Sequence, residues 1–377
     1  MRDIVFADAA VVTNRGRNKR IREDVTLMGE RIVMLGAGAV GGYVGGHLAL
    51  HGHDVTLIDF WPEHIEAIRT NGLELSGMTQ EERQVSHPKT MHLHEVASLA
   101  KQAPVDIAFM CMKSYDTEWM AQLIKPYLAP GGYVVSLQNC INEERIADIV
   151  GWGRTLGCIA SRISVELFEP GKIRRQAPKG AASHTVFRVG EVHGRATERA
   201  KRVVELLDVV DGSQVTSNLW GERWSKLCHN AMRNGVSAAT GLAGREIDQH
   251  EDIRHFTIKI GGEAVRIGQA LGYELEKIGK LDPAKLVLAG DGYAAALKEI
   301  DAILIEESAG GGRGKLQRPS MGQDMLKGRR TEIEFINGHI VDKGAQIGLA
   351  APCNAKITSL VKRVERQELP ISIDNLR

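Results

Sequence analysis

The sequence predicts an α/β domain with a parallel sheet, followed by a second domain made of helices. Between residues 31 and 216, short apolar runs alternate with stretches of helical period, which is typical of a parallel sheet covered on both faces. After Trp220 the pattern changes to long stretches of helical period alone. The length of 377 residues favours two domains over a single core. We therefore expect three parts: an N-terminal extension (1–28), an α/β domain (29–216) and a helical domain (217–377).

The expected strands are apolar runs, and the expected helices of the first domain lie between them. Strands are predicted at residues 32–35, 55–58, 107–112, 133–137 and 156–159, with 184–191 and 209–216 at the later edge of the sheet. Helix-like stretches of this domain cover residues 119–127, 143–150 and 197–207. The helices of the second domain are predicted at residues 224–239, 252–271, 284–307 and 329–346.

Two segments fall outside this regular pattern. Residues 1–28 contain a polar, Arg-rich run, so we interpret them as an appendage that is either disordered or packed on the body. The glycine cluster at 310–314 has no capacity for regular structure. We expect it to form a mobile loop between the last two predicted helices.

The composition excludes several classes of partner. A net charge of +1 lacks the basic excess that nucleic acid or an anionic membrane demands. The five cysteines are scattered, odd in number and never spaced as CxxC, which argues against a disulfide framework and against a metal site. No apolar run reaches about 18 residues, and the N-terminus does not resemble a signal peptide. The sequence therefore predicts a cytoplasmic protein without membrane or nucleic-acid partners.

A glycine fingerprint follows the first predicted strand and precedes a helix. Gly36, Gly38 and Gly41 stand in Gly-Ala-Gly-Ala-Val-Gly. The first glycine permits a tight turn, the second lets the backbone approach a pyrophosphate, and the third lets helix and strand pack closely. The positive end of the helix would face the phosphates. The pattern predicts a Rossmann-type domain that binds a dinucleotide.

Asp59 favours NAD as the cofactor over NADP. It ends the second predicted strand, about twenty residues past the glycines, where a carboxylate can accept both ribose hydroxyls and repel a 2′-phosphate. The next residues are Phe60, Trp61 and Pro62, so no cation follows that could pair with such a phosphate.

Several segments together resemble the ketopantoate reductase (2-dehydropantoate 2-reductase) family, and the resemblance runs from Arg31 to about Arg366. The segments agree with the family in order and spacing: GAGAVGG (36–42), CMKSY (111–115), LQN (137–139), WSKLCHNAMRN (224–234), RPSMGQD (318–324) and TEIEFING (331–338). The chain departs from the family's usual pattern at Asp59, where NADP-using members carry a basic residue just after the strand. It also departs between residues 277 and 318, a stretch that looks longer than usual.

The resemblance implies a role for each matching polar residue. Lys226 would be the general acid and Glu332 its catalytic partner. The side chains that hold an oxo acid would be Asn230, Asn234 and Ser320. The nicotinamide side of the cleft would be lined by Lys113 and Asn139.

Physical chemistry supports Lys226 independently of the resemblance. Reduction of a ketone builds negative charge on its oxygen, and a lysine ammonium supplies both a compensating charge and a proton. Lys226, Asn230 and Asn234 are four residues apart, which places them along one face of a helix. A neighbouring Glu332 would keep the ammonium protonated. The alternatives are an exposed polar helix face for the three residues and a surface salt bridge to an adjacent arginine for Glu332.

Lys113 and Asn139 follow predicted strands, where ligands gather at open α/β sheets. A solvated lysine at the start of a helix is the alternative for Lys113.

These expectations describe an enzyme that transfers hydride between NAD(P)(H) and a small branched 2-oxo or hydroxy acid. One alternative is an NAD-dependent dehydrogenase that oxidises a different hydroxy acid or an alcohol. The other is a dinucleotide-sensing protein without turnover, against which the full set of polar site residues argues. The apolar helices of the second domain could pair in a homodimer.

Overall fold

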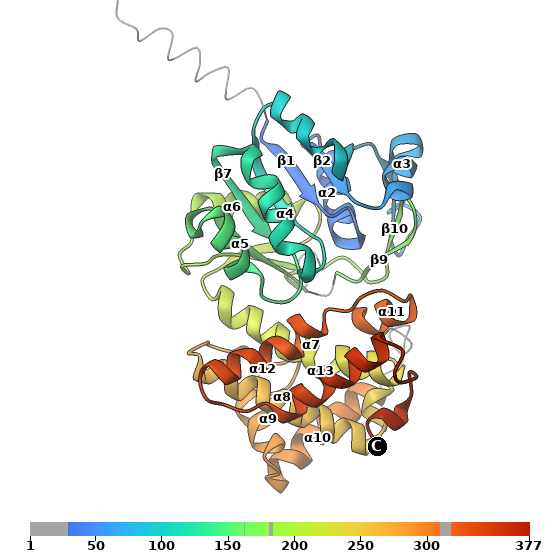
Figure 1. Ribbon diagram of the computed structural model, residues 1–377, viewed down its shortest axis with the longest axis vertical. Coiled ribbons are helices and arrows are strands. Elements are labelled where there is room, and N and C mark those ends of the chain that lie inside the picture. The colour runs from blue at the N-terminus through green and yellow to red at the C-terminus, as the bar shows by residue number, and fades with distance from the viewer. Residues whose placement is uncertain (1–28, 162, 181–183, 310–317) are drawn as a thin grey trace, which may run out of the picture.

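The computed structural model describes residues 29–161, 163–180, 184–309 and 318–377. Figure 1 shows a body built on a β-sheet and a second body built from helices, with the chain passing from the first to the second. The fold class is the one expected, an α/β Rossmann-type domain followed by an all-α domain. The predicted appendage (1–28) and the glycine cluster (310–314) lie outside the described residues.

The described residues form one large sheet with the strand order β12-β11-β8-β7-β6-β1-β2-β5. Its strands are β1 (Arg31–Leu35), β2 (Asp54–Asp59), β5 (Lys89–His92), β6 (Val105–Met110), β7 (Leu128–Ser136), β8 (Thr155–Ala160), β11 (Phe187–Glu191) and β12 (Ser213–Thr216). The pairs from β5 across to β8 are parallel. The carboxyl ends of β1, β6, β7 and β8 therefore meet at one edge, where a ligand site is expected.

Both faces of this sheet are covered, as its apolar strands predict. In β1, Ile32 and Met34 belong to one buried core, while Val33 and Leu35 belong to another on the opposite face. The helices that pack around the sheet are α2 (Ala39–Leu50), α3 (Pro62–Asn71), α4 (Thr117–Ile124), α5 (Glu143–Val150) and α6 (Glu198–Asp208).

Two features of the first body differ from the expectation. Strand β11 runs antiparallel to β8, because the chain between them passes through a hairpin instead of a crossover helix. That hairpin belongs to a second sheet with the order β4-β3-β10-β9, which the sequence pattern did not reveal. Its strands are short and partly exposed, so they lack a long apolar run: β3 (Leu73–Ser76), β4 (Gln84–Ser86), β9 (Val165–Glu169) and β10 (Lys172–Arg175).

The second body consists of helices around a core that includes the fully buried Trp224. Its helices are α7 (Leu219–Thr240), α8 (Glu251–Ala270), α9 (Pro283–Gly290), α10 (Ala294–Ala309), α11 (Ser320–Leu326), α12 (Asn337–Gln346) and α13 (Pro352–Glu365). Within the described ranges, no helix combines the length and the apolar character needed to cross a membrane.

The helix expected at 224–239 begins earlier in the structure, at Leu219, and two other predicted helices of this body differ more. The helix expected at 284–307 is broken into α9 and α10 at Gly292, whose φ of +87° interrupts helical geometry. The helix expected at 329–346 begins only at Asn337, after a short 3-10 turn, η7 (Ile333–Phe335). Glu332 therefore lies on non-helical backbone ahead of α12, where it can reach the first body.

Candidate active site

The glycine turn has the geometry that a dinucleotide requires. Gly36 has a φ of +93°, which permits the tight turn after β1. A Cβ on Gly41 would overlap the carbonyl oxygen of Gly36 and lie 2.7 Å from the Cβ of Cys111, so only glycine lets α2 pack here. A Cβ on Gly38 would meet no protein atom within 4 Å. The turn thus leaves open space beside its middle glycine, at the start of α2, where a pyrophosphate fits.

Asp59 is buried at the end of β2 and binds the backbone of this turn. One carboxylate oxygen accepts the N–H of Ala37 at 2.7 Å, and the other accepts the N–H of Trp61 at 2.9 Å. Each oxygen keeps a lone pair for a further donor. Asp59 therefore shapes the glycine turn in addition to the expected role toward the ribose.

Lys226 extends from α7 of the helical body to the end of strand β8. Its Nζ donates to the carbonyl oxygen of Ala160 at 2.5 Å. Burial, helped by the positive charge of Arg223 one turn earlier, lowers the pKa of Lys226 to about 8. An amine with this pKa can both give and take a proton near neutral pH.

Glu332 contacts Lys113 and Ser114 in the structure, and its charge also acts on the nearby Lys226. Its Oε1 accepts the Ser114 N–H at 2.9 Å and the Ser114 hydroxyl at 2.8 Å, and its Oε2 lies 3.4 Å from the Lys113 ammonium. The negative charge of Glu332 raises the pKa of Lys226, but burial lowers that pKa by more. The net shift of the pKa is therefore downward. The non-helical backbone at Glu332 explains this reach toward the loop after β6.

Lys113 is paired with carboxylates and is not a free surface lysine. It follows β6, and its ammonium binds Asp324 on α11 as well as Glu332. Burial alone would lower the pKa of Lys113, but Glu332 and Asp324 outweigh it and raise that pKa, so the ammonium is charged. These contacts join the two bodies across the expected cleft.

The structure brings together only some of the residues expected to hold a substrate. The side-chain oxygen of the buried Asn234 accepts from the Ser320 hydroxyl at 3.4 Å and from the Met321 N–H at 3.3 Å. Ser320 itself is exposed at the start of α11. Asn230 is half-buried on α7, one turn from Lys226. Asn139 is half-buried in the loop after β7, where its carbonyl accepts from the side chain of Asn142 at 2.9 Å.

Three residues that sequence reasoning did not single out support this site. Ser114 holds Glu332, and Asp324 holds Lys113. Arg223 is fully buried and crosses from α7 to the first body. There it donates to Glu143 and to the carbonyl oxygens of Ser136, at the end of β7, and of Gln138, in the loop that follows. Ser114 and Asp324 stand inside the matched segments, which was the available signal. Nothing in the sequence marks Arg223 beyond its place one turn before Lys226.

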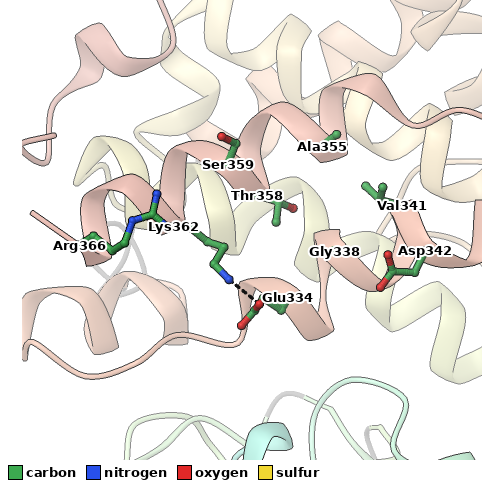
Figure 2. Close-up of a pocket in the computed structure, with 9 residues that line it drawn as sticks. All are labelled: Glu334, Gly338, Val341, Asp342, Ala355, Thr358, Ser359, Lys362 and Arg366. Atoms are coloured by element: carbon green, nitrogen blue, oxygen red, sulfur yellow. Dashed lines mark hydrogen bonds and ion pairs between the residues drawn. The ribbon is translucent and has the colours of Figure 1, made fainter. Parts of the chain in front are cut away.

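A separate cavity lies on the helical body, between α12 and α13. Figure 2 shows its lining, which includes none of the predicted site residues, and its volume is about 430 Å³. Lys362 points toward Glu334 across it and pairs with that carboxylate at 2.5 Å. Because Lys362 and Glu334 satisfy each other's charge, this pair gives no reason to place the chemistry in this cavity.

Comparison with known proteins identifies both halves of the chain. Residues 32–185 match the model described as ketopantoate reductase PanE/ApbA, and residues 218–365 match the C-terminal model of the same family. The 2-dehydropantoate 2-reductase of Archaeoglobus fulgidus is 27% identical over 338 residues, covering 89% of this chain and 98% of that protein. The enzyme of the same name from Pyrococcus horikoshii is 29% identical over 345 residues, covering 89% and 97%.

Solved structures share the fold over a similar length. A PanE/ApbA family ketopantoate reductase from Ralstonia eutropha has a TM-score of 0.71 and 25% identity, covering 90% of this chain and 99% of its own. A D-mandelate dehydrogenase solved with NADH and anilino(oxo)acetate has a TM-score of 0.73 at 23% identity, covering 89% and 98%. The two family matches and the two 2-dehydropantoate 2-reductase relatives show that the chain belongs to the ketopantoate reductase family and is a nicotinamide-dependent oxidoreductase that acts on CH–OH groups.

Proposed function

We propose that this enzyme reduces the carbonyl of a small branched 2-oxo acid, with 2-dehydropantoate and its product pantoate as the leading pair. The observation that carries the proposal is the position of Lys226, whose amine reaches the carboxyl edge of the same sheet that carries the glycine turn. The relatives from Archaeoglobus fulgidus and Pyrococcus horikoshii are named for this reaction. When bound, a nicotinamide cofactor would supply or accept the hydride.

Lys226 would exchange the proton at the substrate oxygen. In reduction its ammonium donates to the oxygen as negative charge develops there, and in oxidation the neutral amine takes the proton from the hydroxyl. Its pKa of about 8 keeps both forms accessible. The carbonyl of Ala160, which now accepts from Lys226, would hold the amine in place between turnovers.

Glu332 would act on this amine in two ways, by its negative charge and by its hydrogen bonds to the neighbouring loop. Its negative charge favours the ammonium form of Lys226, and its bonds to Ser114 keep the loop after β6 against the helical body. Lys113 and Asn139 would face the nicotinamide side of the cleft from the ends of β6 and β7. Residues 29–216 would then serve as the cofactor domain and residues 217–377 as the substrate and catalytic domain.

The substrate carboxylate would be held by Asn230, Asn234 and Ser320. Asn234 and Ser320 already share a hydrogen bond, which supports a common role for the two side chains. Domain closure around such a ligand would exclude water from the reacting atoms.

We propose NAD as the preferred cofactor. Asp59 carries a negative charge next to the turn, and Phe60 beside it is exposed and uncharged. A 2′-phosphate would meet repulsion at Asp59 without a neighbouring cation to offset it.

The second candidate is an NAD-dependent dehydrogenase that oxidises a different hydroxy acid or an alcohol, and Asp59 is the observation that favours it. A dinucleotide sensor without turnover is not supported, because the chain is an oxidoreductase of its family. A homodimer and a cytoplasmic location remain predictions, the first of which light scattering would test.

The reaction is tested by following reduced-nicotinamide absorbance with purified protein and 2-dehydropantoate, with NADH and NADPH in parallel. Oxidation of either nucleotide supports the proposed reaction, and faster oxidation of NADH supports the argument from Asp59. No oxidation of either, by protein that still binds a nucleotide, contradicts the substrate. D-mandelate with NAD would then test the second candidate.

A further inference from the structure

His64 lies next to the glycine turn, near the start of α3, and its ring is fully buried. Its Nε2 lies 2.9 Å from the carbonyl oxygen of Ala37, the residue between the first two glycines of the fingerprint. Its Nδ1 lies 2.9 Å from the backbone nitrogen of Gly171, in the hairpin of the second sheet. The ring therefore bridges the turn and a hairpin that is more than a hundred residues away in sequence.

The two contacts fix the tautomer of the ring. The Gly171 backbone nitrogen can only donate, so Nδ1 accepts and carries no proton. The Nε2 then carries the proton and donates to Ala37. Burial lowers the pKa of His64, which keeps the ring in this neutral form near neutral pH.

The Ala37 residue is thus held at both of its backbone polar groups. Its N–H donates to Asp59 and its carbonyl accepts from His64. Trp61 stacks on the His64 ring, with 5.6 Å between centroids and 22° between planes, and limits its rotation. Three side chains from the end of β2 and the start of α3 therefore set the orientation of the peptide groups beside Gly38.

We propose that His64 is a positioning residue for the cofactor, which orients the glycine turn by bridging Ala37 to Gly171. This inference rests on the proposed cofactor site and adds to it a residue that touches no substrate or cofactor. A turn held in its binding conformation before the dinucleotide arrives loses less freedom on binding. The second sheet thereby contributes to cofactor affinity without contacting the ligand.

The variant H64F tests the bridge because it keeps a ring and removes both hydrogen bonds. With the turn no longer held in its binding conformation, we expect the Kd for the preferred nucleotide to rise about tenfold, which corresponds to about 1.4 kcal/mol. The kcat at saturating cofactor should stay within about twofold, because the chemical step does not involve His64. H64Q, whose amide can both donate and accept, should recover most of the affinity.

The matched control is H51Q, which changes an exposed histidine just after α2 whose Nδ1 lies 2.8 Å from the carbonyl oxygen of His47. It should bind the nucleotide like the parent. Kd is measured by titration of NADH and of NADPH into each protein, without substrate, and thermal unfolding is followed in parallel. If H64F is not recovered folded, H64N replaces it, since the shorter amide cannot span both partners.

A parental Kd in H64F, or in H64N if it replaces H64F, overturns the inference. An equal loss of affinity in H64Q and H64F also overturns it, because that result would indicate loss of the ring's shape alone. A parent protein that binds neither nucleotide would instead contradict the proposed cofactor site itself.

Discussion

The glycine turn and the group of charged residues around Lys226 lie at the same edge of one sheet, but the chain builds them differently. The turn is made within residues 36–41, from the positive φ of Gly36 and from the space that Gly38 and Gly41 leave by lacking a side chain. The charged group combines Lys113, Lys226, Asp324 and Glu332 from four separate segments of both bodies. The turn thus depends on the space left by absent side chains, whereas the charged group depends on how distant segments pack.

This difference has a consequence for what each region tolerates. A methyl group added to the turn overlaps backbone atoms at Gly36 and Gly41, whereas at Gly38 it enters the open space proposed for the pyrophosphate. A charge removed from the charged group leaves its partners buried and changes their pKa values. Substitutions should therefore affect cofactor binding at the turn and the chemical step at the charged group.

The largest effect is expected from K226A. Removal of the proton donor should lower kcat on the order of 10³-fold while the cofactor Kd stays at the parental value. Steady-state kinetics and nucleotide titration measure the two quantities. K298A, at an exposed lysine of α10, is the matched control and should behave like the parent. Turnover by K226A near the parental rate would remove Lys226 from the mechanism.

The turn is tested by comparing G38A with G41A. The Cβ of G38A meets no protein atom, so this variant should fold with a parental melting temperature and bind the nucleotide at least about tenfold more weakly. The Cβ of G41A overlaps the Gly36 carbonyl, so this variant should lose stability as well as affinity. Melting curves and nucleotide titration distinguish the two. Parental affinity in G38A would mean that the open space beside Gly38 is not the phosphate site.

A smaller effect is expected from D324N. Without the charge of Asp324, Lys113 would attract Glu332 more strongly and draw that carboxylate away from its position near Lys226. We expect kcat/KM to fall about tenfold, because a weaker attraction between Glu332 and Lys226 would change the proton affinity of Lys226 by about that factor. D342N, at an exposed carboxylate on α12, is the control. If D324N matched the parent, the contact between Asp324 and Lys113 would have no role in turnover.

The sequence predicted the turn in more detail than the charged group. Gly36, Gly38 and Gly41 are neighbours in the chain, so their spacing and the flanking strand and helix determine the geometry locally. The stripe of Lys226 and Asn234 was visible for the same reason, because both lie on one helix.

The partners of the charged group could not be predicted in the same way. Whether Glu332 contacts Lys226 or Lys113 depends on the residue at which α12 begins. The helical period alone predicted that start several residues too early. The second sheet was missed because its strands are short and partly exposed, and its hairpin meets His64 only through tertiary packing.

The most direct test of the central claim, that Lys226 exchanges the proton, is the pH dependence of kcat/KM in both directions of the reaction. Reduction needs the ammonium form, so its rate should fall as pH rises through about 8, the pKa of Lys226. Oxidation needs the neutral amine, so its rate should rise through the same value. Profiles that are flat over about two pH units on either side, or that slope in the same direction, would contradict the account.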